Sequence, residues 1–294
     1  MTASARYRSG KGSHDENFPV ASLLIRRRHR PAILAFYEFV RVADDIADHP
    51  SMPGPEKLAH LDKLEATLLG DDDSEPEGVA LRAMLRRHGL TPLHAQHLLQ
   101  AFRQDVVKKR YADWDELIDY CRFSAMPVGR YVLDVHGEPQ STWPASDALC
   151  AALQIINHVQ DCAKDYRDLD RVYVPLDALG ANGLDVNALA APQASPALRK
   201  TLRGLLGRTT LLLQQSRPFA SQVGDTRLAM EIAAIQALAE RLIGVLHDHD
   251  PLCDKVHLSK AAMLGTAGCA AVSILARRLL RRSERGYRPQ PRES

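Results

Sequence analysis

Hydrophobic residues recur at helical spacing along the whole chain, and the alternation typical of β-strands is nearly absent. In the stretch 31–48, for example, Ile33, Phe36 and Val40 fall on one helical face. The chain shows no internal repeat and no linker rich in Gly, Pro or Ser that would separate two cores. We therefore expect a single all-α domain, and 294 residues are enough to bury a substantial core.

Proline and capping residues indicate where the helices begin and break. Pro19 and Pro31 suit the first turn of a helix, whereas Pro127 lies inside the helical stretch 117–136 and predicts a kink or break there. Further helix starts are expected at Thr91-Pro92, Asp113, Ser146 and Ser195-Pro196. Long helices are expected over 195–222, 226–248 and 259–282. The segment 169–194 is expected to be a Gly- and Pro-rich connection.

The charge is distributed unevenly, although the formal net charge is only +2. Residues 1–30 and residues 277–294 each carry a net charge of about +5, which leaves the middle of the chain near −8. Basic ends around an acidic body argue against a surface that wraps nucleic acid. They favour a protein that holds something anionic through internal cations.

The cysteines and the hydropathy pattern indicate a cytoplasmic protein. The five cysteines form no CxxC pair and no zinc-like spacing, so free thiols in a reducing compartment are expected. The N-terminus lacks the apolar stretch of a secretory signal, and no run of about 18 apolar residues is long enough to cross a membrane. At most, we expect the protein to lie on a membrane surface.

A polar stripe interrupts the apolar pattern of the first long helix. Tyr37, Arg41, Asp44 and Asp48 have offsets of 0, 4, 7 and 11, which place them on one helical face. The opposite face is apolar, so this stripe faces either water or a polar cavity.

A second stripe occurs much later in the chain, on a helix that is apolar around most of its circumference. Gln154, Asn157, Asp161 and Asp165 have offsets of 0, 3, 7 and 11. A helix that is apolar on most sides is usually buried, and buried carboxylates need compensation by cations. The second stripe therefore predicts a polar site inside the protein.

Taken together, the two stripes predict a site for a metal-bound diphosphate. Carboxylates spaced i, i+4 repel each other, and this spacing occurs once in each stripe. Oxygen ligands of this kind bind Mg²⁺ when substrate phosphates complete its octahedron. One such motif alone is more often a solvated helix end, but two matching stripes favour the metal site. The predicted catalytic residues and metal ligands are Asp44, Asp48, Asp161 and Asp165, with Asn157 as a further ligand and Gln154 and Arg41 as contacts to the metal waters or phosphates.

The segments 36–48 and 154–165 resemble the two aspartate-rich motifs of the squalene and phytoene synthase family, and 171–175 (RVYVP) resembles the segment that follows them. The resemblance extends from about residue 14 to residue 262. It implies a single-domain isoprenoid synthase fold with a central hydrophobic cavity, Mg²⁺ at the cavity mouth and a prenyl diphosphate substrate. We expect the domain to span 17–276, between a flexible basic N-terminus (1–16) and a basic tail (277–294).

Within this family, the segments 16–20, 124–130, 160–162 and 169–173 are most similar to the bacterial squalene and hopanoid branch that converts presqualene diphosphate to hydroxysqualene. That reaction is Mg²⁺-dependent ionisation, cation rearrangement and capture by water. Relatives that condense two prenyl diphosphates usually have Arg at the position of Gln160 and more basic residues in the region of 252–260. Fewer cations suit a substrate with one diphosphate. The alternatives are a head-to-head prenyl transferase that makes presqualene diphosphate, squalene or phytoene, and a non-catalytic isoprenoid-binding partner.

The resemblance also suggests substrate-binding residues and partners. Aromatic residues at helical spacing are usually core packing, yet we expect some of them to line the cavity. The segment 273–292 is either a basic amphipathic helix on anionic lipid or a solvated helix end. The candidate partners are therefore a membrane surface and, from the resemblance, other enzymes of the same pathway. The predicted substrate-binding residues are Phe18, Tyr37, Arg41, Gln154, Arg171, Tyr173 and Lys255, and the roles of His14, His249 and His257 are left open.

Overall fold

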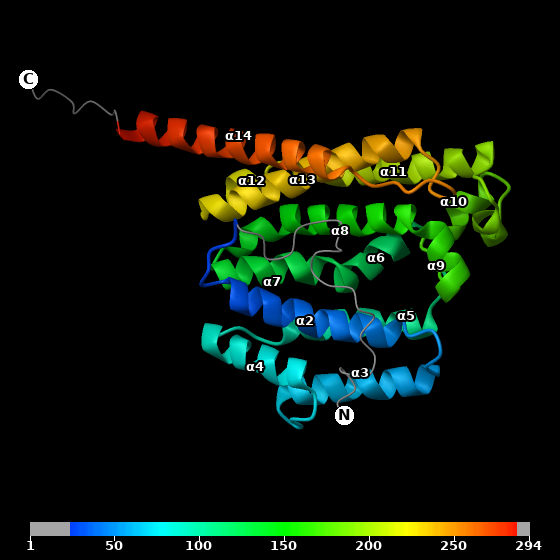
Figure 1. Ribbon diagram of the computed structural model, residues 1–294, viewed down its shortest axis with the longest axis horizontal. Coiled ribbons are helices and arrows are strands. Elements are labelled where there is room, and N and C mark those ends of the chain that lie inside the picture. The colour runs from blue at the N-terminus through cyan, green and yellow to red at the C-terminus, as the bar shows by residue number, and fades with distance from the viewer. Residues whose placement is uncertain (1–23, 287–294) are drawn as a thin grey trace, which may run out of the picture.

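The computed structural model describes residues 24–286, which fold into helices joined by short connections (Figure 1). This range contains no β-strand, and one isolated bridge pairs Arg110 with Val172. The prediction of an all-α protein is therefore confirmed. The helices are α2 (Arg30–Ala47), α3 (Gly54–Leu69), α4 (Pro76–His88), α5 (Leu93–Val107), α6 (Trp114–Ser124), α7 (Met126–His136), the 3₁₀ helix η1 (Gln140–Thr142), α8 (Trp143–Gln160), α9 (Cys162–Leu169), α10 (Leu176–Gly180), the 3₁₀ helix η2 (Val186–Ala190), α11 (Pro196–Ser216), α12 (Phe219–Gln222), α13 (Thr226–Asp248) and α14 (Lys260–Gly286).

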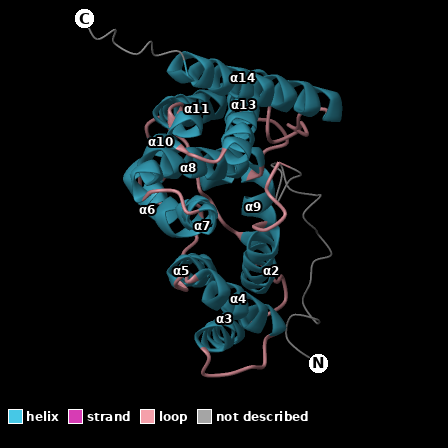
Figure 2. Ribbon diagram, turned by 90° about the vertical axis from the view of Figure 1, so that its left-hand side faces the viewer, coloured by secondary structure: helices cyan, strands magenta, loops and turns pink. Residues whose placement is uncertain are grey.

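The helices are stacked with α3 and α4 at one end of the molecule and α14 at the other (Figures 1 and 2). One buried hydrophobic cluster joins α2 to α3, α4 and α5. A second cluster is centred on α8 and includes residues of α6, α7, α11 and α13. The cavity described below lies between the two clusters, because its wall takes residues from both.

Several predicted helix boundaries are confirmed. Pro31 lies in the first turn of α2, and the break near Pro127 separates α6 from α7. The Asp113 carboxylate accepts a hydrogen bond from the Glu116 backbone N–H (2.9 Å) at the start of α6. The Ser195 hydroxyl caps α11 in the same way. These caps satisfy backbone N–H groups that have no partner within the helix.

Other boundaries differ from the prediction. The helix expected to begin at Ser146 begins at Trp143, with Pro144 in its first turn. The helix expected over 195–222 is divided at Pro218, because proline has no N–H to continue the hydrogen-bond ladder. The connection over 169–194 contains α10 and η2. Pro19 lies outside the described residues.

Helix α14 lies along α13 and is exposed over most of its surface (Figure 1). Its segment Lys260–Leu280 is long and apolar enough to cross a membrane, by length and composition alone. The expectation that no segment meets this criterion was therefore wrong. The helix also continues through residues 277–286, where a separate tail was expected to begin.

A close approach of α7 to α8 depends on Gly129. A Cβ atom at this position would lie 2.4 Å from the Ser146 Oγ atom and 2.6 Å from the Cys150 Sγ atom. Both distances are too short for real atoms, so a larger residue at position 129 must displace the Ser146 and Cys150 side chains or move the two helices apart. Because both helices line the cavity, such a shift would alter the cavity wall.

We expect Gly129→Ala to lower the free energy of unfolding by about 1–3 kcal/mol, because it overpacks this contact. Gly207→Ala is the control: Gly207 is exposed within α11 and faces open space, so alanine should raise stability by about 0.5–1 kcal/mol. Urea unfolding measures both. A Gly129→Ala protein as stable as the parent would contradict the packing argument, whereas partial rescue by Ser146→Ala with Cys150→Ala would support it.

Candidate functional site

A cavity of about 560 Å³ lies between α2, α7, α8 and α13. Most of its wall is apolar, with Ile33, Phe36, Leu149 and Ile232 among the lining residues. Carboxylates gather at one end of it, where α2 and α8 terminate. A largely apolar cavity with polar groups at one end suits a ligand with a hydrocarbon body and an anionic head.

Both predicted stripes line this cavity. The first comes from α2, and the second from the junction of α8 and α9. The second helix breaks at Asp161, yet the Asp165 N–H still donates to the Asp161 carbonyl (2.8 Å), so the stripe continues across the break. The lining residues of the two stripes are Tyr37, Arg41, Asp44 and Asp48, and Gln154, Asn157, Asp161 and Asp165.

The first stripe holds an internal ion pair. The Arg41 guanidinium lies 3.1 Å from Asp44 and 2.9 Å from Asp45. Burial, together with the neighbouring Asp48 carboxylate, nevertheless raises the pKa of Asp44 to about 8, and Arg41 offsets only part of this rise. The site therefore has more negative charge than Arg41 neutralises.

The second stripe also has more negative charge than its neighbouring cation neutralises. Burial and the Asp161 carboxylate raise the pKa of Asp165 to about 7, although Lys164 acts in the opposite direction. Carboxylates with raised pKa values gain most from a divalent cation, which favours their ionised form. The donor set of this end of the cavity therefore fits Mg²⁺.

The described residues contain no group of three His, Cys, Asp or Glu side chains close enough to hold a metal ion by themselves. Mg²⁺ keeps several waters and usually takes only one or two carboxylates, with substrate phosphates as the other ligands. An all-protein cage is therefore absent from residues 24–286, and Mg²⁺ bound by these carboxylates would need further ligands from water or phosphate.

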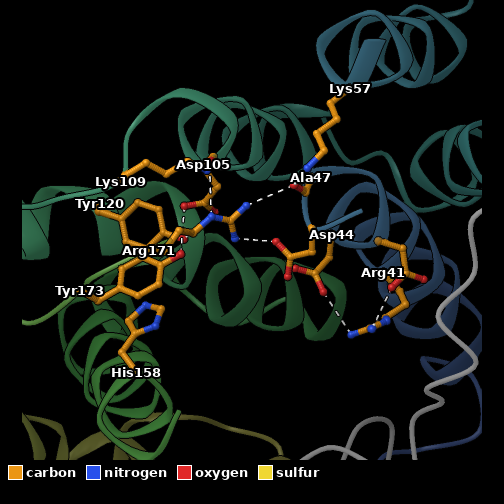
Figure 3. A network of polar contacts seen from close by, with 12 residues as sticks. Arg41, Asp44, Ala47, Lys57, Asp105, Lys109, Tyr120, His158, Arg171 and Tyr173 are labelled. Carbon is orange, nitrogen blue, oxygen red and sulfur yellow. Dashed lines mark hydrogen bonds and ion pairs between the residues drawn. The ribbon is translucent and has the colours of Figure 1, made fainter. Parts of the chain in front are cut away.

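Arg171 ties the end of α2 to the end of α5 (Figure 3). Its guanidinium donates to the Asp48 carboxylate, to the Ala47 carbonyl (3.1 Å) and to the Asp105 carbonyl (3.2 Å). It lines the cavity, as expected for a substrate-binding residue, but these three acceptors hold it in place. Its direct effect is to orient Asp48 and to neutralise part of its charge.

Asp105 is the centre of a buried network at the same end (Figure 3). Its carboxylate accepts hydrogen bonds from Tyr120 (2.8 Å) and Tyr173 (3.1 Å). Burial raises the pKa of Asp105 to about 6, against the effect of Arg171. The ring of His158 stacks on Tyr173 at 3.5 Å, and burial lowers the pKa of His158 to about 3, so this imidazole is neutral.

Sequence reasoning missed Asp105, although a signal was present. Leu98, Phe102 and Asp105 share one helical face at offsets 0, 4 and 7, so a carboxylate stands on the apolar face of α5. A charged residue on a buried face is the same signal that identified the second stripe.

The structure does not bring Lys255 to the cavity: its side chain is exposed, in the connection before α14. Gln160 is buried, and its amide donates to the Val256 carbonyl, so it holds this connection and does not line the cavity. His249 and His257 are exposed and also lie away from the cavity wall. Phe18 and His14 lie outside the described residues.

The comparisons with known proteins agree with this geometry. The squalene/phytoene synthase family model matches residues 12–262. A hydroxysqualene synthase of Rhodopseudomonas palustris is 57% identical over 88% of each chain, and one of Sinorhizobium fredii is 50% identical over 97% of this chain and 98% of its own. The solved structure of squalene synthase HpnC from Alicyclobacillus acidocaldarius, 30% identical, superposes with a TM-score of 0.71 over 84% of this chain and 92% of that one. This chain has the isoprenoid synthase fold and belongs to the squalene/phytoene synthase family.

Proposed function

We propose that this protein is a hydroxysqualene synthase, which converts presqualene diphosphate and water to hydroxysqualene and diphosphate. The observation that carries the proposal is the cavity itself, with two aspartate stripes at one end and a largely apolar wall elsewhere. The hydroxysqualene synthases that match this chain do so at about half identity or more over nearly its whole length. The substrate diphosphate would lie among the aspartates and its C30 hydrocarbon body along the apolar wall.

The oxygen donors that would hold Mg²⁺ are Asp44, Asp48, Asp161, Asp165 and the amide of Asn157. When bound, Mg²⁺ supplies positive charge that stabilises the diphosphate as a leaving group. The protein residues around it have separate tasks, which follow from their contacts.

Arg41 adds a fixed cation at the polar end and can bind a phosphate oxygen, since guanidinium groups suit phosphate geometry. Arg171 keeps Asp48 in position through the bonds described above. Tyr37 and Phe36 line the cavity with aromatic side chains, and an aromatic ring can stabilise a cation near its face. The apolar wall excludes bulk water, so the cation formed on ionisation can rearrange before it is captured.

Asp44→Asn should lower turnover of presqualene diphosphate by at least about 100-fold, because one oxygen anion facing the metal is lost. Chelation of Mg²⁺ should abolish turnover of the parent protein. Diphosphate release measures both effects, and Asp119→Asn, at an exposed position of α6, is the matched control. Full activity of the Asp44 variant or of the chelated enzyme would contradict the proposed metal site.

The same variant should stabilise the metal-free protein. The pKa of Asp44 rises from 3.8 to about 8 on folding. Between pH 3.8 and about pH 8, Asp44 is therefore ionised in the unfolded chain but largely protonated in the folded protein, so the free energy of unfolding falls as the pH rises through this range. Asp44→Asn removes this loss, and its melting temperature should exceed that of the parent by about 2–4 °C at pH 8, with a smaller difference at pH 5. An equal difference at both pH values would contradict this account.

The reaction product distinguishes a hydroxysqualene synthase from a head-to-head prenyl transferase. Condensation brings two diphosphates into one cavity, whereas within the described residues the Lys and Arg side chains on the cavity wall are Arg41 and Arg171, and both already pair with aspartates. With presqualene diphosphate, Mg²⁺ and no nicotinamide cofactor, we expect hydroxysqualene; with farnesyl diphosphate alone, we expect at least about tenfold less product per enzyme. Chromatography with mass spectrometry identifies both. Efficient condensation, or NADPH-dependent formation of squalene, would assign the chain to another branch of the family.

We also propose that the protein is cytoplasmic and that α14 lies on an anionic membrane surface. Arg278 donates to the Ala220 carbonyl (2.9 Å) and the Gly224 carbonyl (3.0 Å), which fixes the helix lengthwise on the protein. Arg277, Leu279 and Leu280 are exposed. A docked helix with exposed leucine and arginine suits binding in the plane of the membrane.

Replacing Leu279 and Leu280 together by Ser should reduce sedimentation with vesicles that contain phosphatidylglycerol by about threefold or more, because less apolar surface enters the lipid. Leu211→Ser, at an exposed leucine of α11, is the control and should have no effect. Raising the salt concentration should also weaken binding. Equal sedimentation of all three proteins would contradict the membrane contact.

A further inference from the structure

One carboxylate on the cavity wall has no task in the mechanism described so far. Six acidic residues line the cavity within the described range. Five of them, Asp44, Asp48, Asp105, Asp161 and Asp165, belong to the polar end. The sixth is Glu231, on α13, which is 4% exposed.

Glu231 lies away from the polar end, toward the place where α2 and α13 begin. Asp225, just before α13, forms an ion pair with Arg26, just before α2 (2.7 Å). Figure 1 shows both helices running from this side of the molecule to the other. Glu231 is about 9 Å along α13 from Asp225, whereas Asp44 is about 21 Å along α2 from the helix start at Arg30.

The residues of α13 beside Glu231 that line the cavity are apolar. Leu228 and Ile235 share its face of the helix, Ile232 is the next residue along the chain, and Phe219 of α12 also lines the cavity. Removing a carboxylate from water costs several kcal/mol. A buried carboxylate on the wall of a largely apolar substrate cavity is therefore a candidate for chemistry on the substrate.

The proposed reaction needs such a group. Formation of an alcohol from a carbocation requires a water molecule in a cavity that otherwise excludes water, and an acceptor for one of its protons. A carboxylate can hold the water by a hydrogen bond and accept the proton as a general base. Asp105 is less suited to this task, because both of its carboxylate oxygens already accept hydrogen bonds from tyrosines.

We propose that Glu231 holds the water that captures the rearranged cation and accepts its proton, an assignment that rests on the proposed function. The bond between carbon and the diphosphate oxygen breaks, and its electron pair leaves with the diphosphate. After rearrangement, a lone pair of the water oxygen forms the new carbon–oxygen bond. One water proton passes to a Glu231 carboxylate oxygen and from there returns to solvent with the products. No redox partner is needed.

Because Glu231 is separated from the aspartates, the ionisation step and the water-capture step take place at different parts of the cavity. Ionisation occurs at the polar end, and capture occurs beside α13. If Glu231 were absent, the same cation would still form, but it would lose a proton from carbon or be captured without control. The assignment therefore predicts a change of product with little change in the rate of diphosphate release.

The experiment compares the parent protein with Glu231→Gln and Glu240→Gln on presqualene diphosphate and Mg²⁺. Glu240 lies on the same helix but is partly exposed, next to Arg217, so it receives the same chemical change outside the cavity. Diphosphate release and the product mixture are measured together, in water enriched in ¹⁸O so that capture by water is counted directly. We expect Glu231→Gln to release diphosphate within about threefold of the parent rate, while the hydroxysqualene share of its products falls at least tenfold and elimination products replace it. Glu240→Gln should match the parent.

The outcomes separate the two proposals. If the parent protein makes no hydroxysqualene, the proposed function fails and this assignment fails with it. If the parent makes hydroxysqualene and Glu231→Gln gives the same product share, only the role of Glu231 is overturned. Loss of diphosphate release in a folded Glu231→Gln protein would also overturn it, because the residue would then act in binding or ionisation. Circular dichroism establishes folding, and Glu231→Asp, which keeps the carboxylate, should recover part of the hydroxysqualene share even if the glutamine variant is unfolded.

Discussion

Asp44, Asp48, Asp161 and Asp165 come from two helices that are far apart in the sequence, and all four line one end of an apolar cavity. Burial and, to a smaller extent, mutual repulsion raise the pKa values of Asp44 and Asp165, so the fold keeps carboxylates where they are unfavourable in the absence of a cation. The surrounding structure reduces this cost only in part, through Arg41 and Arg171. The remaining negative charge would give the proposed site its affinity for a divalent cation and, through it, for a diphosphate.

The cationic side chains at this end of the cavity form hydrogen bonds within the protein itself. Arg171 bonds to Asp48, to the end of α2 and to the end of α5, so it holds the first stripe against the helix that carries Asp105. Lys57 and Lys109 donate to the Ala47 carbonyl (2.8 Å) and the Asp105 carbonyl (3.0 Å), which adds two further links at the same helix ends (Figure 3). The polar end is therefore rigid, as a site that positions a leaving group has to be.

Much of the fold, and the two polar stripes that line the cavity, could be predicted, because both depend on helical periodicity. The stripes on α2 and α8 stand out as polar residues on helices that are otherwise apolar, and their offsets alone place each set on one face. The failures have physical reasons. The position of Lys255 depends on the path of an irregular connection, which periodicity does not describe, and the break at Asp161 carries no proline or glycine signal. Asp105 and Glu231 were missed because each is a single acid on an apolar face, which is a weaker signal than a stripe of four polar residues.

Glu231 is a single acid on an apolar helix face, and such an acid can have a function that differs from that of a paired motif. A paired motif marks a metal or phosphate site because the ligand needs several oxygens at once, whereas a general base or a water-binding group acts alone. Chemistry on a carbocation needs a cluster of oxygens that takes the leaving group. It also needs an apolar wall with few nucleophiles, so that the cation survives long enough to rearrange. Within such a wall, one carboxylate can determine where water is held and therefore which carbon of the rearranged cation the water attacks. The placement of one residue on α13 can therefore direct the product of a reaction that the aspartates of α2, α8 and α9 begin.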